Sequence, residues 1–425
     1  MEKIRIERGF ETEMTDLVVE SSFHTSNWTV GYGGSISTVG PAKDGVLYFG
    51  CCDNYIYSIK AKTGEMLWKF KAGGIFNESR PVLHDNLLFV GNYDGYLYVI
   101  DVKNGELAWK FKTGDRIITS VFIKDGIVYT GSWDGYLYAL RLRDGGEIWR
   151  FRAGDKVSTC ALVHGDNIYF GCFDGNLYCL DMNGKEKWRF RTGGSIITYQ
   201  NLVLYQDRIF FPSYDKYLYC TNLEGNLVWK FKTGGNVLSS QCISDGLIYF
   251  GSHDNNFYAL DVETGKEIWR FRTGNWIGDV KPLVANGMVY FGSVDNNFYA
   301  LDAKTGEMLW KFRTGGGIWS DSILHEKMII FGSWDCHVYA LDLRTGKEIW
   351  RFATSTKQQS PLEISDEIIV KPQFVEKKGS ETETEREYEA AARINLSESF
   401  YAPAIEYAGK DVYGAKKKYG DTREA

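Results

Sequence analysis

The sequence predicts an all-β fold, an eight-bladed β-propeller of four-stranded antiparallel blades with short N- and C-terminal extensions. Eight tryptophans recur at intervals of 39 to 41 residues. Each interval holds four short runs of strand-forming residues bounded by Gly, Asn or Asp, and no helical periodicity interrupts them. The periodic tryptophans are Trp68, Trp109, Trp149, Trp188, Trp229, Trp269, Trp310 and Trp350.

One repeat, residues 236–274, shows how a blade is expected to form. Residues 236–244 are moderately apolar with small side chains and are interpreted as the innermost strand. Residues 247–252 and 257–260 follow as the second and third strands, and residues 267–272 as the outermost. Eight such copies predict eight blades.

Two further positions recur in all eight copies. An aspartate follows the second strand: Asp53, Asp94, Asp134, Asp174, Asp215, Asp254, Asp295 and Asp335. A tyrosine lies in the third strand: Tyr57, Tyr98, Tyr138, Tyr178, Tyr219, Tyr258, Tyr299 and Tyr339. A residue needed in every blade serves the blade, so we interpret both as structural, with the carboxylate bonding backbone amides of its own turn.

The outermost strand alternates aromatic and basic residues, as in Trp68-Lys69-Phe70-Lys71. Trp and Phe are expected to pack between blades, with the indole N–H bonding a carbonyl. Lys and Arg on the other side are expected to face water and to prevent edge-to-edge pairing. The alternative is a polyanion-binding girdle, which would require these charges to converge on one patch.

Composition limits the classes of function. The chain has a net charge of −6 and a pI of about 5.7, and it lacks a single basic face, so nucleic acid is not expected as a partner. No apolar stretch reaches 18 residues, so no membrane insertion is expected. A charged N-terminus without an apolar segment after it, and cysteines placed mostly inside strands, indicate a cytoplasmic protein. The six histidines are scattered and predict no metal site.

The expected domains are an N-terminal extension (1–27), the propeller (28–354), degenerate extra strands (355–375), and a charged linker with a Tyr/Lys-rich tail (376–425). Residues 27–34 repeat the outer-strand pattern around Trp28 and would either fasten the ring or cap an edge. The tail would be disordered or fold onto a partner, and we favour the second.

The pattern Ala-x-Asp-x-x-Thr-Gly-x-x-x-Trp occurs at residues 259–269, 300–310 and 340–350. It resembles the tryptophan-docking motif of the pyrroloquinoline-quinone-type eight-bladed propellers. That family includes quinone-dependent dehydrogenases and non-catalytic members. The dehydrogenases hold the quinone and Ca²⁺ on long insertions between blades, and the constant spacing here leaves none. The resemblance therefore implies a non-catalytic member without a cofactor.

Cys51-Cys52 is the feature that keeps the dehydrogenase alternative open, because some of these enzymes carry a vicinal disulfide over the quinone. Here the pair occupies a variable turn before Asp53, where other blades carry pairs such as Asn92-Tyr93. We interpret it as a reduced pair that fills the turn.

Function is expected where the blades differ. In the innermost strands, most blades have Thr or Ser at one position, whereas two blades have Glu78 and Asp279. Two residues later these blades carry Arg80 and Lys281. Alternation places each acid and base on the same side of its strand, near the axial channel. They would form two local ion pairs or a solvated lining, or else a site for a small polar ligand or peptide.

The entry to the inner strands, at the mouth of the channel, holds Phe76, Arg116, Lys156, Trp276 and Trp319. Aromatic residues with arginine on a rigid rim suit a protein interface, and packing between blades is the equal alternative.

The leading hypothesis is a non-enzymatic intracellular propeller that acts as a binding platform for proteins, using its axial face and C-terminal tail. The first alternative is a quinone- or other cofactor-dependent oxidoreductase with Glu78 or Asp279 as base. The second is a ligand sensor.

Overall fold

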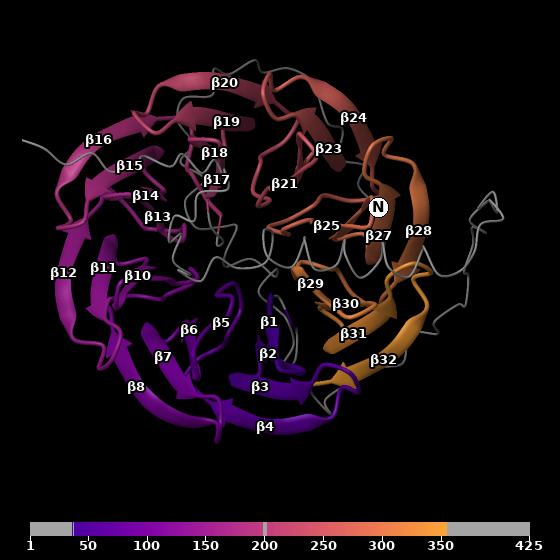
Figure 1. Cartoon of the computed structure of the whole chain (residues 1–425), viewed down its shortest axis with the longest axis horizontal. Helices are drawn as coiled ribbons and strands as arrows, with labels where there is room; N and C mark the ends of the chain where they lie inside the picture. Colours follow the sequence, from indigo (N-terminus) through magenta and orange to yellow (C-terminus); the bar gives the residue numbers. More distant parts are fainter. Residues whose placement is uncertain (1–35, 37, 199–201, 355–425) are drawn as a thin grey trace, which may run out of the picture.

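The computed structural model describes residues 36, 38–198 and 202–354, and within them the chain forms a closed wheel of eight four-stranded sheets (Figure 1). The first strand of each blade lies toward the centre and the fourth forms the rim. The predicted all-β, eight-bladed fold is confirmed. The other expected segments (1–27, 355–375 and 376–425) lie outside the described residues. So does the Trp28 strand, with which the expected propeller begins.

The strands follow in chain order, four to a blade. Blade 1 holds β1 (Thr38–Lys43), β2 (Val46–Gly50), β3 (Tyr55–Lys60) and β4 (Met66–Lys71). Blade 2 holds β5 (Val82–His84), β6 (Leu87–Gly91), β7 (Tyr96–Asp101) and β8 (Glu106–Lys112). Blade 3 holds β9 (Phe122–Lys124), β10 (Ile127–Gly131), β11 (Tyr136–Arg141) and β12 (Glu147–Arg152). Blade 4 holds β13 (Leu162–His164), β14 (Asn167–Gly171), β15 (Asn176–Asp181) and β16 (Glu186–Arg191).

The second half of the wheel repeats this plan. Blade 5 holds β17 (Val203–Tyr205), β18 (Arg208–Pro212), β19 (Tyr217–Asn222) and β20 (Leu227–Lys232). Blade 6 holds β21 (Cys242–Ser244), β22 (Leu247–Gly251), β23 (Asn256–Asp261) and β24 (Glu267–Arg272). Blade 7 holds β25 (Leu283–Ala285), β26 (Met288–Gly292), β27 (Asn297–Asp302) and β28 (Met308–Arg313). Blade 8 holds β29 (Ser322–His325), β30 (Met328–Gly332), β31 (His337–Asp342) and β32 (Glu348–Ala353).

The innermost strand is shorter than expected. In blade 6 only Cys242–Ser244 pairs with β22, and residues 236–241 leave the sheet. Their polar groups bond elsewhere: the Ser239 hydroxyl donates to the Val280 carbonyl of blade 7 at 2.7 Å, and the Asn236 carbonyl accepts from the His253 N–H at 3.0 Å. This segment therefore runs along the channel wall, where it joins neighbouring blades.

Each periodic tryptophan wedges one blade against the next. Its ring lies on a left-handed glycine in the turn between the third and fourth strands of the following blade. A Cβ on Gly265, for example, would lie 2.6 Å from Trp229. Six indole N–H groups donate to a carbonyl of that blade at 3.0–3.2 Å. The expected packing between blades is present, and it explains why a Thr-Gly or similar turn accompanies each tryptophan.

The recurrent Asp–Tyr pair is a second link. In every blade the tyrosine hydroxyl donates to the aspartate at 2.5–2.7 Å. The other oxygen accepts a backbone N–H of its own turn, as expected. In five blades the aspartate also accepts an N–H from the preceding blade, as Asp254 does from Gly234 at 2.7 Å. The carboxylate therefore joins blades as well as shaping its turn.

The ring closes by the same contacts, and among the described residues blades 8 and 1 exchange no strand. Trp350 donates to the Ala61 carbonyl at 3.1 Å, and Tyr57 donates to the Thr354 carbonyl at 3.1 Å. Ile36 packs against Gly332. Each of the two sheets consists of four consecutive strands.

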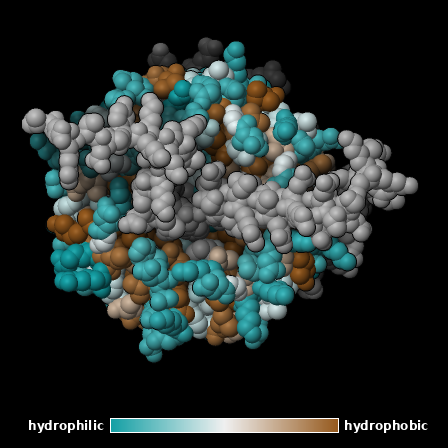
Figure 2. Space-filling model, in the orientation of Figure 1, coloured by the Kyte–Doolittle hydropathy of each residue, from teal (hydrophilic) through white to brown (hydrophobic). Residues whose placement is uncertain are grey.

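The basic residues of the outer strands are spread round the rim. Several lie over tyrosines, as Lys69 does over Tyr55 at 4.5 Å, and others pair with glutamates three residues earlier, as Arg351 does with Glu348 at 2.6 Å. Figure 2 shows hydrophilic and hydrophobic residues interspersed round the visible rim. This distribution favours edge protection over a polyanion girdle.

Candidate binding site on the axial face

One end of the channel gathers aromatic and cationic side chains. Because the strands alternate in direction, the connections between blades and the turns between second and third strands meet at this end. We call the side chains found there the axial collar. The collar consists of Tyr93, Arg116, Trp133, Lys156, Phe173, Tyr214, His253, Trp276, Trp319 and Trp334.

Backbone hydrogen bonds fix the collar. The residue just before the recurrent aspartate donates its N–H to the carbonyl at the start of its own blade's inner segment. Trp133 bonds Arg116 in this way, and Phe173 bonds Lys156, each at 3.0 Å. The side chains of the turn and of the connection are therefore held beside one another in blades 2 to 8.

On one side of the collar, cations alternate with rings. The Arg116 guanidinium lies 4.8 Å from the Tyr93 ring centre and 4.6 Å from that of Trp133. The Lys156 ammonium lies 4.7 Å from Trp133 and 5.5 Å from Phe173. Stacked cations keep their outer edges available, and the Arg116 side chain is 31% exposed.

On the other side the collar is purely aromatic. The Trp276 and Trp319 rings meet edge to face at 4.9 Å, and Trp319 stacks on Trp334 at 5.6 Å. His253 lies against Trp276 at 4.5 Å, and burial lowers the pKa of His253 to about 4, so this ring is neutral near pH 7. Trp276 and Trp319 thus pack on each other and still remain partly exposed.

Glu78 lies directly beneath the collar. It is buried and accepts the hydroxyl proton of Tyr93 in a short hydrogen bond. Burial raises the pKa of Glu78 to about 7, although the bond from Tyr93 and the charge of Arg116 oppose the rise. Asn77 donates to the Tyr93 oxygen at 3.3 Å. Glu78 therefore anchors the collar and is not paired with Arg80.

Arg80 reaches another blade. Its guanidinium binds Asp321 of blade 8 at 2.8 Å, and both side chains are almost fully buried. The other oxygen of Asp321 accepts the Lys281 backbone N–H at 2.6 Å. Blades 2, 7 and 8 are thus joined through one carboxylate.

The register explains why sequence reasoning misaligned these residues. The hydroxyl that bonds the last glycine of the second strand belongs to Thr119 in blade 3, and to Ser79, not Glu78, in blade 2. Blades 2 and 7 each hold one extra residue in the inner segment. In blade 7 the chain bends around Asp279, and the Val280 N–H donates to the Gly278 carbonyl. Arg80 and Lys281 therefore correspond to Ser120 and Asp321, whereas simple counting aligns them with Val121.

Asp279 of blade 7 is also buried. Its carboxylate accepts the Ser240 hydroxyl at 3.2 Å and the Thr198 hydroxyl at 3.4 Å. It therefore ties blade 7 to blades 5 and 6. The structure brings Glu78 and Arg116 together through Tyr93, brings Arg80 and Lys281 together through Asp321, and leaves Asp279 with the hydroxyls.

Sequence reasoning identified Arg116, Lys156, Trp276 and Trp319 but missed the other six members of the collar and Asp321. It also placed Phe76 at the mouth of the channel, whereas Phe76 is fully buried. The turn before the recurrent aspartate was recognised as variable, but the residues there were not assigned to the channel. A usable signal existed: six of the eight residues directly before that aspartate are aromatic or histidine, namely Tyr93, Trp133, Phe173, Tyr214, His253 and Trp334.

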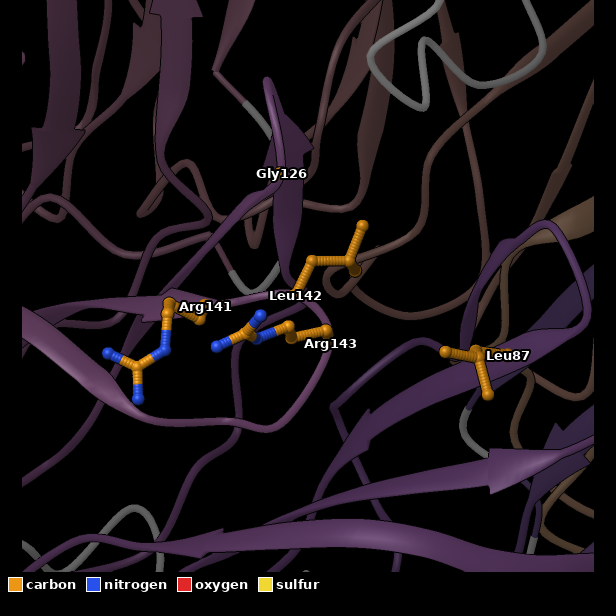
Figure 3. Close-up of a pocket in the computed structure, with 5 residues that line it drawn as sticks. All are labelled: Leu87, Gly126, Arg141, Leu142 and Arg143. Carbon is orange, nitrogen blue, oxygen red and sulfur yellow. The ribbon is translucent and has the colours of Figure 1, made fainter.

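The opposite end of the wheel offers a different surface. An open depression between blades 2 and 3 is lined by Leu87, Gly126, Arg141, Leu142 and Arg143 (Figure 3). Arg141 and Arg143 both bind Asp144, at 3.0 and 3.1 Å, whereas Arg116 of the collar lies farther, 3.8 Å, from its carboxylate partner Asp115. The axial collar is the better candidate.

The described part of the chain offers neither a metal site nor a membrane-spanning helix. No group of His, Cys, Asp or Glu side chains there could hold a metal ion. Residues 36, 38–198 and 202–354 contain no helix of the length and apolarity needed to cross a bilayer. All eight cysteines are described and are free thiols, including the buried Cys51 and Cys52.

Comparison with known proteins agrees with the fold. A family model described as outer membrane protein assembly factor BamB matches residues 52–270 and 214–373. None of the curated proteins matches the sequence.

Two solved structures share the architecture at low identity. The crystal structure of the computationally designed Ika8 protein is 16% identical with a TM-score of 0.65, covering 74% of this chain and 98% of its own. BamB from Moraxella catarrhalis is 14% identical with a TM-score of 0.60, covering 72% and 93%. The family match spans most of the propeller, and the chain belongs to the pyrroloquinoline-quinone-type propeller repeat family.

Proposed function

We propose that this protein is a non-enzymatic platform that binds a protein partner through the axial collar. The observation that carries the proposal is the collar itself, a group of rings that are partly exposed, apart from the buried Trp133, together with two stacked cations. Rigid aromatic residues with arginine dominate binding energy in protein interfaces. The collar is built where the blades differ, so maintenance of the ring does not explain its composition.

The family supports a role in interaction or assembly. The matching family model bears the name of an assembly factor, and such proteins act by contact with other proteins. An intracellular location also forms part of the proposal. Eight free thiols, seven of them buried, suit a reducing compartment.

The test places a photo-crosslinking amino acid at position 116 in the native cell. We expect one stoichiometric partner to be captured from Arg116. The same label at Lys304, an exposed residue of the turn at the other end of blade 7, should not capture it.

Reversing the charge of the collar cations gives the second part of the crosslinking experiment. Arg116→Glu with Lys156→Glu should abolish capture from a label at the neighbouring exposed Asp115, whereas Lys304→Glu should leave it intact. Equal capture from positions 115, 116 and 304, or capture unaffected by the double substitution, would overturn the proposal.

A further inference from the structure

One side of the collar is built from tryptophan rings that rest on backbone. Trp319 lies over Gly278, where a Cβ would come within 2.9 Å of the indole, and Trp334 lies over Gly317 at the same spacing. Trp276 meets Trp319 edge to face at 4.9 Å. All three rings are partly exposed, and we call Trp276, Trp319 and Trp334 the tryptophan row. The row is therefore a firmly seated apolar surface that water reaches.

The described residues end beside this row. The N–H of Thr354 donates to the Cys336 carbonyl at 3.0 Å, and the hydroxyl of Thr354 donates to the same carbonyl at 3.1 Å. Cys336 lies two residues after Trp334, in the turn between β30 and β31. Because this turn belongs to the collar end of the wheel, the chain leaves β32 next to the tryptophan row.

The sequence that follows is apolar at a short distance from this point. Residues 355–360 are polar, and five of the ten residues in 361–370 are hydrophobic, namely Leu362, Ile364, Ile368, Ile369 and Val370. Such side chains gain free energy when they leave water. The eight residues from Thr354 to Leu362 span up to about 29 Å when extended. The row is shorter, since its ring centres follow one another at 5.6 and 4.9 Å.

The spacing of this segment repeats a strand whose place in the wheel is already filled. Ile368 follows Trp350 by eighteen residues, which is the spacing from Trp109 to Ile127, the first residue of β10. The family match also continues to residue 373. The corresponding place after blade 8 is held by β2 of blade 1. The segment therefore has the apolar pattern of a second strand, and blade 1 does not need it.

We propose that residues 361–370 dock on the tryptophan row and cover it in the free protein. Three observations select this occupant: the chain leaves the wheel beside the row, the segment is apolar within reach of it, and the place that its pattern would take in the ring is filled. Docking here leaves Arg116 and Lys156 open to a partner. The inference goes beyond the proposed function and does not depend on it.

The experiment uses the purified full chain without any partner. A photo-crosslinking amino acid replaces Ile369, and mass spectrometry identifies the linked peptides. We expect links within one chain to the peptides that contain Trp276, Trp319 or Trp334. The same label at Ile349, which is 49% exposed on β32 at the rim, should not link to these peptides.

Variants of the row and of the segment sharpen the test. Trp276→Ala with Trp319→Ala should lower the yield of these links about tenfold, because interface tryptophans carry much of the binding energy. The matched pair Ile148→Ala with Ile268→Ala, at exposed apolar positions of the rim, should leave the yield unchanged. Ile368→Ser with Val370→Ser changes the segment alone, should lower the yield to a similar extent, and decides the question if the tryptophan pair does not fold.

Four results would overturn the docking. The first is no link from position 369 to the row, and the second is links only between chains, which would assign the row to a second copy. The third is capture of the row from a label at Val30 instead, because the chain also enters beside the row, where the Ile36 N–H donates to the Ser333 carbonyl at 3.2 Å. The fourth is a yield that neither pair of substitutions lowers. Partner capture from position 116 in the cell is a separate readout, so either proposal can fail alone.

Discussion

The rim and the axis of the wheel use aromatic and charged residues for different ends. At the rim, every blade repeats one contact, an indole on a left-handed glycine, and one Asp–Tyr bond. At the axis, the same residue types vary from blade to blade and contact one another across blades, as Arg116 of blade 3 and Tyr93 of blade 2 do. The comparison teaches that repetition marks the residues that close the ring, whereas departure from repetition marks the surface available for binding.

The largest expected effect comes from breaking a rim wedge. Gly265→Ala places a methyl group 2.6 Å from Trp229 at a φ of +68°, and we expect it to lower the free energy of unfolding by about 2–4 kcal/mol. Urea unfolding measures the change. Gly246→Ala in the same blade has a φ of +77° and no atom within 4 Å, so it should cost only about 1 kcal/mol. Equal losses would show that the wedge contributes nothing beyond backbone strain.

A pH series on Glu78 tests the axis. Its pKa is raised from 4.5 to about 7, so the folded state binds more protons than the unfolded state between these values. Stability should therefore fall as pH rises through this window, by up to about 3 kcal/mol. Glu78→Gln should remove this fall, and Glu65→Gln, at an exposed turn, should retain it. Parallel pH profiles for wild type and Glu78→Gln would contradict the assignment.

The Asp–Tyr bond predicts a smaller effect at the rim. Tyr258→Phe deletes a 2.7 Å bond to Asp254, which keeps its backbone donors, so we expect a loss of about 1–2 kcal/mol. Chemical denaturation measures it. Tyr205→Phe in blade 5 removes a hydroxyl whose hydrogen-bond partner among the described residues is the exposed Gln206, and it should change stability by less than about 0.5 kcal/mol. If Tyr258→Phe lowers the free energy of unfolding no more than Tyr205→Phe does, the Asp254–Tyr258 bond does not stabilise the fold.

The smallest effect on stability is expected at the collar. Arg116→Ala with Lys156→Ala removes two partly exposed cation–π stacks and should cost about 1 kcal/mol in total. Thermal unfolding checks this value. A loss of unfolding free energy as large as that of Gly265→Ala would mean that the collar stabilises the ring and is not mainly a binding surface.

The rim could be predicted well from the sequence because every blade repeats the same interaction with the same residue types. Trp269, Asp254 and Tyr258 have equivalents at a constant spacing, so their structural role followed from the repeat alone. The inner segment was predicted less well. It leaves the sheet after Asn236, so strand alternation does not apply to it, and single extra residues such as Asp279 shift the register. The partner of Arg80 lies 241 residues away in blade 8, and no local pattern indicates such a contact.

The most direct measurement compares one rim variant and one collar variant in the same two assays, urea unfolding and crosslinking from position 115. We predict that Gly265→Ala loses stability and still captures the partner below its unfolding midpoint. Arg116→Glu with Lys156→Glu should nearly keep its stability and lose capture. A collar variant that unfolds as readily as Gly265→Ala, or that captures the partner as well as the wild type, would contradict the division between a rim that closes the ring and an axis that binds.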